Sequence, residues 1–394
     1  MRRSTRDVAW FWDTVLRDLD IQFYKPYSRV VNLSDGKPWA KWCVGGEMNI
    51  VHNLLDKYAD TPIDKKPAIK SEIEDPAAAG RSLTYKELRD QVDRMANALR
   101  ALGLGKGDAI GVFMPMIPEI VVAMLAIIKI GGIFLPLFSG FGAAAIVSRL
   151  NDAEAKALFT AAGTYRRGKF CPMKPIADEA AAQIPTLKHL IVLQTLNSAS
   201  TPHPPLSSAP EERKKNRDTA PAETRKTALT EDAAFGRLSP SQGERMEVRG
   251  WATHSWDELI QKIGKRSDAS TEHTSAEDPM MIIYTSGTTG KPKGAVHTHC
   301  GFPIKSAQDM WHGLDLHPDE TLFWMTDMGW MMGPWEVFGT LILGATMMLF
   351  DGAPDFPGPD RVWSLVARHK VTALGVSPTL IRALRRYGDE IVHR

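Results

Sequence analysis

The sequence of 394 residues has few cysteines, little net charge and no long uninterrupted apolar run, and each shortage excludes a class of protein. Its three cysteines, Cys43, Cys171 and Cys300, lie far apart and without metal-ligand spacing. They favour buried or unreactive thiols over a disulfide framework or a zinc site, and they fit the reducing cytoplasm. A net charge of +2 gives no general attraction to nucleic acid or to a membrane surface.

Residues 120–138 are the one stretch that approaches the composition of a membrane span. Lys129 and the pair Gly131-Gly132 interrupt it, which predicts a buried helix followed by a buried strand. Residues 1–20 mix Arg, Asp and Trp without an apolar centre, so we expect no secretory signal. A content of 43% hydrophobic and 24% charged residues is ordinary for a globular protein, and we expect a cytoplasmic one.

What the sequence does contain is a Gly-, Ser- and Thr-rich loop, residues 285–294, between two short apolar segments. The flanking residues 280–284 and 295–297 are predicted to be strands. Glycines let backbone N–H groups approach a ligand, hydroxyl groups add donors, and Lys291 and Lys293 add positive charge. This combination predicts polyphosphate binding, and a solvated hairpin without a ligand is the alternative.

The spacing within this loop differs from that of the common nucleotide-binding phosphate loop. Only two residues separate Gly287 from Gly290, where four are needed, and Pro292 follows Lys291 where a hydroxyl residue is needed. This excludes a GTPase or a kinase. The wording Tyr-Thr-Ser-Gly-Thr-Thr-Gly-Lys-Pro-Lys-Gly instead resembles the loop of the adenylate-forming (AMP-binding) enzymes: acyl-CoA synthetases, luciferases and peptide-synthetase adenylation domains.

Residues 1–60 are rich in Trp and Tyr but lack periodicity, so we expect irregular structure packed on a larger body. Within them, residues 42–50 (Trp-Cys-Val-Gly-Gly-Glu-Met-Asn-Ile) and 53–56 (Asn-Leu-Leu-Asp) resemble the amino-terminal extension of acetyl-CoA synthetases. Luciferases and peptide-synthetase domains lack that extension. The resemblance is therefore to an acetyl-CoA synthetase-like acyl-CoA synthetase, in its amino-terminal portion only.

Residues 61–195 alternate helices and strands and form a first predicted subdomain. Thr84 and Glu87 form a capping box ahead of a helix that Gly103 ends. Apolar strands are predicted at 109–113, 133–137, 157–160 and 189–193, and helices at 118–130 and 143–150. Short apolar strands between helices predict an α/β fold with stacked, mostly parallel sheets flanked by helices, which is also what the resemblance implies.

Residues 196–252 interrupt this pattern. They are rich in Ser, Pro and charge and poor in large aliphatic residues, which predicts a disordered insertion at a surface loop. Residues 253–394 then form a second predicted subdomain that includes the loop. Its elements are predicted as helices at 299–313, 361–368 and 378–387 and strands at 321–326 and 371–376.

The resemblance implies an AMP-forming reaction in which a carboxylate attacks ATP and the acyl group then passes to coenzyme A. The phosphates of ATP would contact Thr285, Ser286, Gly287, Thr288, Thr289, Gly290, Lys291 and Lys293. The implied cofactors are ATP, Mg²⁺ and coenzyme A, and the implied partners are small molecules, with no nucleic acid.

The acyl pocket would be formed by Trp330, Met331 and Met332, which follow the Asp-x-Gly of a family segment. Acetyl-specific enzymes carry a smaller Val-Thr pair at the two methionine positions. Methionine is long and adaptable. We therefore expect a short- or medium-chain acid and do not assume acetate.

Coenzyme A would approach Gly140, and its 3′-phosphate would contact Arg166 and Lys169. The family usually has arginine at the position of Lys169. Lysine keeps the charge but loses the bidentate fork, which predicts weaker phosphate binding there.

Several family segments have no counterpart in the sequence: the Tyr-x-x-Thr-Glu motif whose Glu binds magnesium, the ribose-binding Asp, and the small carboxy-terminal domain with its catalytic Lys. We therefore expect no metal ligand in these 394 residues, and a chain that is catalytically incomplete. Two alternatives stay open. One is an adenylate-forming enzyme with an acceptor other than coenzyme A, and the other is a non-catalytic, ATP-binding remnant.

Overall fold

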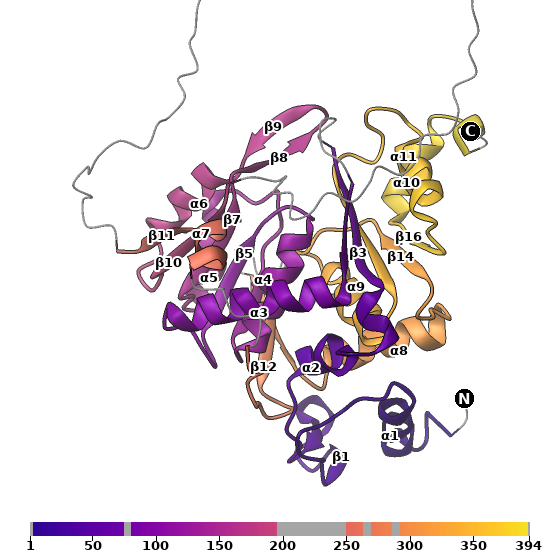
Figure 1. The fold of residues 1–394 in the computed structure, drawn as a ribbon. Coiled ribbons are helices and arrows are strands. Elements are labelled where there is room, and N and C mark those ends of the chain that lie inside the picture. Colours follow the sequence, from indigo (N-terminus) through magenta and orange to yellow (C-terminus); the bar gives the residue numbers. More distant parts are fainter. Residues whose placement is uncertain (1–2, 75–79, 195–249, 263–268, 286–291, 393–394) are drawn as a thin grey trace, which may run out of the picture. The chain divides into compact units, whose positions relative to one another are not determined.

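Two β-sheets, with helices between and around them, form the framework of the chain (Figure 1). The structure is a computed structural model and describes residues 3–74, 80–194, 250–262, 269–285 and 292–392. The predicted phosphate-loop residues 286–291 and the predicted insertion, except residues 250–252, lie outside the described residues. All described residues belong to one structural unit.

The larger sheet has seven strands in the order β11-β10-β7-β5-β6-β12-β13. In chain order their bounds are β5 Ala109–Phe113, β6 Ile133–Pro136, β7 Ala157–Ala161, β10 His189–Leu193, β11 Ala252–Ser255, β12 Pro279–Thr285 and β13 Lys293–Thr298. All neighbours are parallel except β12 and β13, which form an antiparallel hairpin. The two strands predicted around the phosphate loop are thus confirmed.

The smaller sheet has five strands in the order β16-β14-β15-β3-β4. Their bounds are β3 Pro67–Ile73, β4 Arg81–Thr84, β14 Thr321–Trp324, β15 Thr346–Asp351 and β16 Ala373–Gly375. Only β3 and β4 pair antiparallel. The α/β fold with mostly parallel sheets is confirmed. Each sheet takes strands from both predicted subdomains, whose boundaries remain a prediction.

Two further hairpins lie outside these sheets: β1 (Arg29–Asn32) with β2 (Lys41–Val44), and β8 (Gly163–Arg166) with β9 (Lys169–Pro172). The helices are α1 Val8–Asp18, α2 Ile50–Leu54, α3 Tyr85–Ala101, α4 Pro118–Lys129, α5 Ala143–Asp152, α6 Lys174–Ala181, α7 Trp256–Lys262, α8 Phe302–Gly313, α9 Met332–Ile342, α10 Arg361–His369 and α11 Pro378–Arg385.

The helices α3 and α4 lie between strands of the two sheets, β5 on one side and β3 on the other (Figure 1). Every residue of α4 is buried. Helix α3 begins with the predicted capping box, in which Thr84 and Glu87 bond each other's backbone N–H, and Gly103 follows its end with a φ of 79°. The apolar stretch of residues 120–138 therefore forms most of the buried helix α4 and then the strand β6.

The amino-terminal residues are more regular than the sequence predicted. The expectation of irregular structure is wrong for α1, where Asp7 caps the helix by accepting from the N–H of Trp10. Val15 and Leu16 of this helix are buried, while neighbouring aromatic side chains pack against the same core. Tertiary packing of one apolar face thus stabilises this helix, although its aromatic-rich sequence shows no clear helical periodicity.

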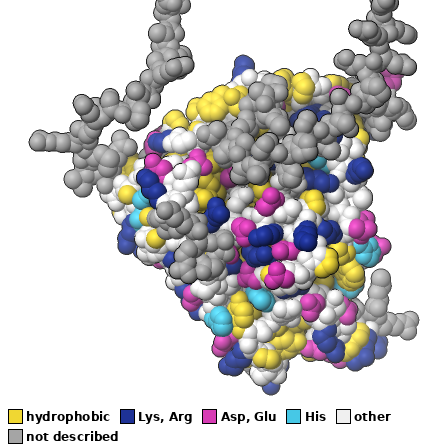
Figure 2. All heavy atoms as spheres, in the orientation of Figure 1, with side chains coloured by type: hydrophobic (Ala, Val, Ile, Leu, Met, Phe, Trp, Pro, Cys, Tyr) yellow, Lys and Arg dark blue, Asp and Glu magenta, His cyan; other side chains and the backbone are white. Residues whose placement is uncertain are grey.

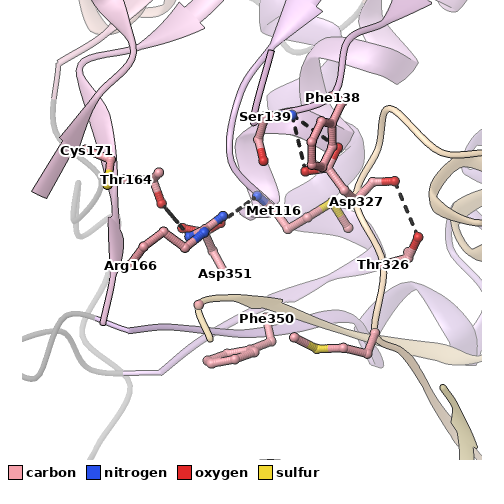
Figure 3. Close-up of a pocket in the computed structure, with 13 residues that line it drawn as sticks. Met116, Phe138, Ser139, Thr164, Arg166, Cys171, Thr326, Asp327, Phe350 and Asp351 are labelled. Atoms are coloured by element: carbon pink, nitrogen blue, oxygen red, sulfur yellow. Dashed lines mark hydrogen bonds and ion pairs between the residues drawn. The ribbon is translucent and has the colours of Figure 1, made fainter. Parts of the chain in front are cut away.

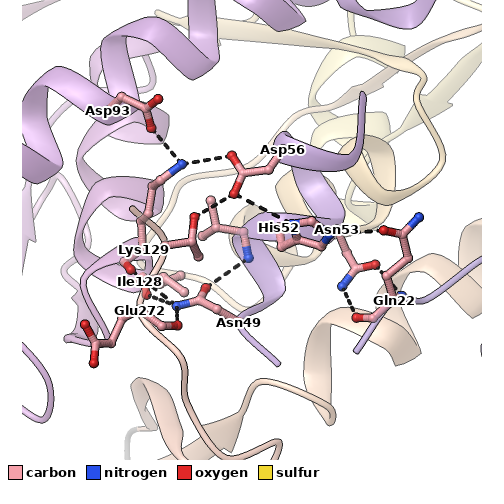
Figure 4. A network of polar contacts seen from close by, with 11 residues as sticks. Gln22, Asn49, His52, Asn53, Asp56, Asp93, Ile128, Lys129 and Glu272 are labelled. Carbon is pink, nitrogen blue, oxygen red and sulfur yellow. Dashed lines mark hydrogen bonds and ion pairs between the residues drawn. The ribbon is translucent and has the colours of Figure 1, made fainter. Parts of the chain in front are cut away.

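A network of polar contacts attaches this amino-terminal region to the body (Figure 4). Asn49 donates through Nδ2 to the carbonyl oxygens of Ile128, at 2.8 Å, and Glu272, at 3.2 Å. Lys129 pairs with Asp56 at 2.8 Å and with Asp93 at 2.6 Å. Burial raises the pKa of Asp93 to about 6, although the neighbouring Lys129 acts to lower it.

The surface agrees with the small net charge of the sequence. Figure 2 shows basic and acidic side chains intermingled on one face of the molecule. In the part of the chain that the structure describes, no helix is both long enough and apolar enough to span a membrane.

Candidate functional site

A cavity of about 340 Å³ lies where loops from both sheets meet (Figure 3). Most of its lining follows the carboxyl ends of parallel strands, which is the usual location of ligand sites in open α/β sheets. The lining residues are Met116 after β5; Phe138, Ser139 and Gly140 after β6; Thr164, Arg166 and Cys171 from the hairpin β8–β9; Met325, Thr326 and Asp327 after β14; and Phe350, Asp351 and Gly352 around the end of β15.

Asp327 joins the two loops at one side of this cavity. Its Oδ1 accepts from the N–H of Gly329 at 2.8 Å, and both carboxylate oxygens lie 3.4 Å from the N of Ser139. Burial raises the pKa of Asp327, while these hydrogen bonds act to lower it. A Cβ on Gly329 would lie 2.2 Å from the backbone N of Phe138, so only glycine allows this approach.

Arg166 enters the cavity from β8 and is fixed by three hydrogen bonds. Its Nη2 donates to Asp351 Oδ1 at 2.8 Å, and its Nη1 donates to Thr164 Oγ1 at 2.9 Å and to the carbonyl of Tyr165 at 2.7 Å. The Thr164 hydroxyl also donates to Asp351 Oδ2. Burial acts to lower the pKa of Arg166, but its bond to Asp351 raises it overall.

The hairpin that carries Arg166 is attached at its turn as well. The turn residues Arg167 and Gly168 have φ values of 53° and 73°, as a two-residue hairpin turn requires. Glu74, directly after β3, accepts from the N–H of Gly168 at 2.7 Å and of Ala353 at 2.6 Å. Arg167 also pairs with Asp355 at 2.7 Å. Arg166 therefore directly precedes a turn whose backbone is held by Glu74, whereas the pair of Arg167 with Asp355 joins side chains only.

A buried carboxyl group fixes the strand that leads to Asp327. Glu336 lies in α9, is fully buried, and accepts from the N–H of Trp324 through Oε1 at 2.9 Å. Among the described residues its Oε2 has no hydrogen-bond partner. Burial raises the pKa of Glu336 well above its ordinary range, although the Trp324 N–H acts to lower it.

The ends of the predicted phosphate loop lie side by side. Thr285 ends β12, Lys293 begins β13, and the two residues pair directly in the hairpin. Both side chains are exposed. Ser286, Gly287, Thr288, Thr289, Gly290 and Lys291 lie outside the described residues, so phosphate binding by this loop stays a prediction.

The structure brings two of the predicted coenzyme A residues, Gly140 and Arg166, into one cavity. Lys169 pairs with Arg166 across the hairpin but is exposed and is not part of the lining. Trp330 and Met331 precede α9 and are 59% and 55% exposed. Trp330 lies beside the cavity, with its ring 5.6 Å from that of Phe138.

Met332 is the first residue of α9 and is partly buried. Within the residues described, no three His, Cys, Asp or Glu side chains gather as a metal site would require. The binding of Mg²⁺ is therefore not tested by the structure.

Sequence reasoning missed several residues that shape the cavity: Met116, Thr164, Asp351 and, at the hairpin turn, Glu74. One signal was available. Asp351 ends β15 and Glu74 directly follows β3, so these acidic residues lie at the carboxyl ends of two adjacent parallel strands.

Two protein families match the sequence. Residues 56–393 match the family described as AMP-binding enzyme, and residues 1–54 match the acetyl-coenzyme A synthetase N-terminus. The acetyl-coenzyme A synthetase of Mycolicibacterium smegmatis is 35% identical over 98% of this chain and 36% of its own length. That of Methanothrix thermoacetophila is 35% identical over 96% of this chain and 50% of its own length.

A solved structure agrees with these matches. The acetoacetyl-CoA synthetase from Streptomyces lividans superposes with a TM-score of 0.79 and 28% identity, over all of this chain and 52% of its own. The chain thus spans about half the length of most of these relatives, and the match lies in the amino-terminal part of the fold.

Proposed function

Because the chain belongs to the AMP-binding enzyme family, we propose that the whole protein is an AMP-forming carboxylate–CoA ligase. It would activate a short- or medium-chain carboxylic acid with ATP, release pyrophosphate, and transfer the acyl group to the thiol of coenzyme A. The observation that carries this proposal is the cavity that joins Gly140, Arg166 and Asp327 from three separate segments. The names of its relatives, acetyl-coenzyme A and acetoacetyl-CoA synthetases, support the same reaction class.

ATP would bind at the tip of the hairpin β12–β13. Thr285 and Lys293, on either side of the loop, pair directly, and N–H and hydroxyl groups of the loop would contact the β and γ phosphates. Lys293, at the start of β13, would offset phosphate charge together with Lys291. Mg²⁺, where it is bound together with ATP, would offset further negative charge on the phosphates.

The acid would lie beside Trp330, Met331 and Met332. The first two side chains are largely exposed, so they are free to enclose an acyl chain without a change in the buried core. Two methionines leave less room than a smaller pair but adapt their shape readily. Acetate, propionate, butyrate and acetoacetate are therefore the acids to compare.

Coenzyme A would place its 3′-phosphate at Arg166 and Lys169, with Gly140 on its path. Arginine is suited to bidentate phosphate contacts, and Lys169 adds a second charge across the hairpin. Asp327 ties the Gly140 loop to the turn before α9. These contacts would keep the proposed acyl and coenzyme A sites at a fixed distance from each other.

Exchange of labelled pyrophosphate into ATP tests the first half-reaction in the whole protein. The proposal predicts exchange that requires one of these acids and that Lys293→Ala slows. Lys305→Ala is the matched control, because Lys305 is also exposed but lies on α8 in a pair with Asp309. Exchange that is independent of any carboxylic acid would overturn the proposal.

A further inference from the structure

We propose that Asp351 is a positioning residue that fixes the guanidinium of Arg166 for the 3′-phosphate of coenzyme A. This inference rests on the proposed function. Its basis is a closed set of contacts, since Asp351 accepts from Arg166 Nη2 at 2.8 Å and from the hydroxyl of Thr164. Thr164 in turn accepts from Arg166 Nη1 at 2.9 Å. The carboxylate therefore holds the guanidinium both directly and through a second side chain (Figure 3).

The contacts leave a defined part of the guanidinium for a ligand. An arginine side chain has five N–H donors in a planar fork. Within the described part of the chain, two of them on Nη1 and one on Nη2 of Arg166 bond protein oxygens. The Nε–H and the second Nη2–H remain, and two donors suffice for one bidentate phosphate contact.

Asp351 and Arg166 differ in burial, so that only Arg166 is accessible to a ligand. The side chain of Asp351 is 2% exposed, whereas that of Arg166 is 36% exposed. Asp351 ends β15 and also lies 3.4 Å from the backbone N of Met116, so groups from several elements fix its position. The aspartate is thus the rigid member of the pair.

Without Asp351, the guanidinium has other carboxylates to contact. Asp327 and Glu74 both contribute to the electrostatic field at Arg166. Neutralising Asp351 would release Arg166 from its fixed orientation and let it turn toward them. An immobilised side chain also loses less conformational entropy when a ligand binds. Both effects predict weaker binding of the 3′-phosphate.

One effect acts in the opposite direction, because removal of a negative charge reduces repulsion of a phosphate. That repulsion is screened where the phosphate meets solvent, whereas the hydrogen bonds to Arg166 act at contact distance. We therefore expect the loss of orientation to dominate. The affinity for coenzyme A should fall about tenfold, which equals about 1.4 kcal/mol.

The test compares coenzyme A with 3′-dephospho-coenzyme A by isothermal titration calorimetry on the whole protein. The Kd of 3′-dephospho-coenzyme A divided by the Kd of coenzyme A measures recognition of the 3′-phosphate alone. Asp351→Asn should reduce this ratio about tenfold. Asp355→Asn is the matched control, because it removes the same charge from the neighbouring Arg167 and should leave the ratio unchanged.

Two further variants separate positioning from a general loss of structure. Thr164→Val removes the bridging hydroxyl with little change in volume and should reduce the ratio about threefold, even if Asp351→Asn does not fold. In an Arg166→Gln background, Asp351→Asn should have no further effect on the ratio.

The outcomes distinguish the two proposals. Absence of binding of either ligand by the wild type would overturn the proposed function and, with it, the positioning role. A wild type that discriminates between the ligands, with unchanged or increased discrimination in Asp351→Asn or in Thr164→Val, would overturn the positioning role alone. An equal effect of Asp355→Asn would also overturn it, since charge rather than orientation would then explain the result.

Discussion

Replacement of Glu336 by glutamine should change how the stability of the protein depends on pH. The side chain is fully buried in α9, and its Oε1 accepts from the N–H of Trp324 at 2.9 Å. Burial raises the pKa of Glu336 well above its ordinary range, so the folded chain holds a neutral carboxylic acid there. Glutamine keeps the shape and the acceptor but has no proton to lose.

The size of the effect follows from proton linkage. The unfolded glutamate titrates near its ordinary pKa of about 4.3, while the folded one keeps its proton to higher pH. At Glu336 the folded state thus binds more protons, and the contribution of this group to the free energy of unfolding falls as pH rises above about 4.3. The slope reaches about 1.4 kcal/mol per pH unit until the folded-state pKa is passed. The variant lacks this slope.

Urea denaturation of both proteins at about pH 5, 6 and 7 measures this difference. At the lowest pH the variant should be less stable by about 1–3 kcal/mol, because the amide of glutamine has two N–H donors without an acceptor where the carboxylic acid has one O–H. The deficit should shrink by up to about 1.4 kcal/mol per pH unit as pH rises toward the folded-state pKa of Glu336. The exposed Glu258 is the control for substitution by glutamine. A deficit that stays constant with pH would refute the neutral buried carboxyl.

Three further predictions concern packing and binding. Asn49→Asp removes both donors that cap the carbonyl oxygens of Ile128 and Glu272, and should lower the free energy of unfolding by about 2–4 kcal/mol in urea; an unchanged midpoint would contradict this. Gly329→Ala places a methyl group 2.2 Å from the N of Phe138 and should cost at least about 2 kcal/mol in the same assay; a wild-type midpoint would mean that the two loops do not meet. Arg166→Lys should weaken coenzyme A binding about tenfold but leave 3′-dephospho-coenzyme A unaffected in calorimetry; equal losses would show that the arginine does not contact the phosphate.

Much of the fold was predictable because its signals are local. The capping box at Thr84 and Glu87 gives the start of α3, and the apolar runs give β5 and α4 almost to the residue. Helix α9 was missed because Gly333, Pro334 and Gly339 normally argue against a helix. Proline is tolerated there in the first turn. Gly339 is required because a Cβ would lie 2.4 Å from Met310 Sδ.

Residues of the candidate site were predictable only where they belong to a short sequence motif. Gly140 and Arg166 were found by resemblance, and the structure brings them into one cavity. Asp351 and Glu74 were not found, because their partners lie 94 or more residues away in the sequence. Pairing between the hairpin β8–β9 and the ends of β3 and β15 depends on topology, which local patterns do not contain.

The most direct test of the central claim is a product analysis of one reaction of the whole protein with acid, ATP, Mg²⁺ and coenzyme A. The account predicts AMP and an acyl-CoA thioester in equal amounts, both dependent on the acid, and at most a trace of ADP. Formation of ADP as the main nucleotide product, or of AMP without consumption of coenzyme A, would contradict the assignment as an AMP-forming carboxylate–CoA ligase.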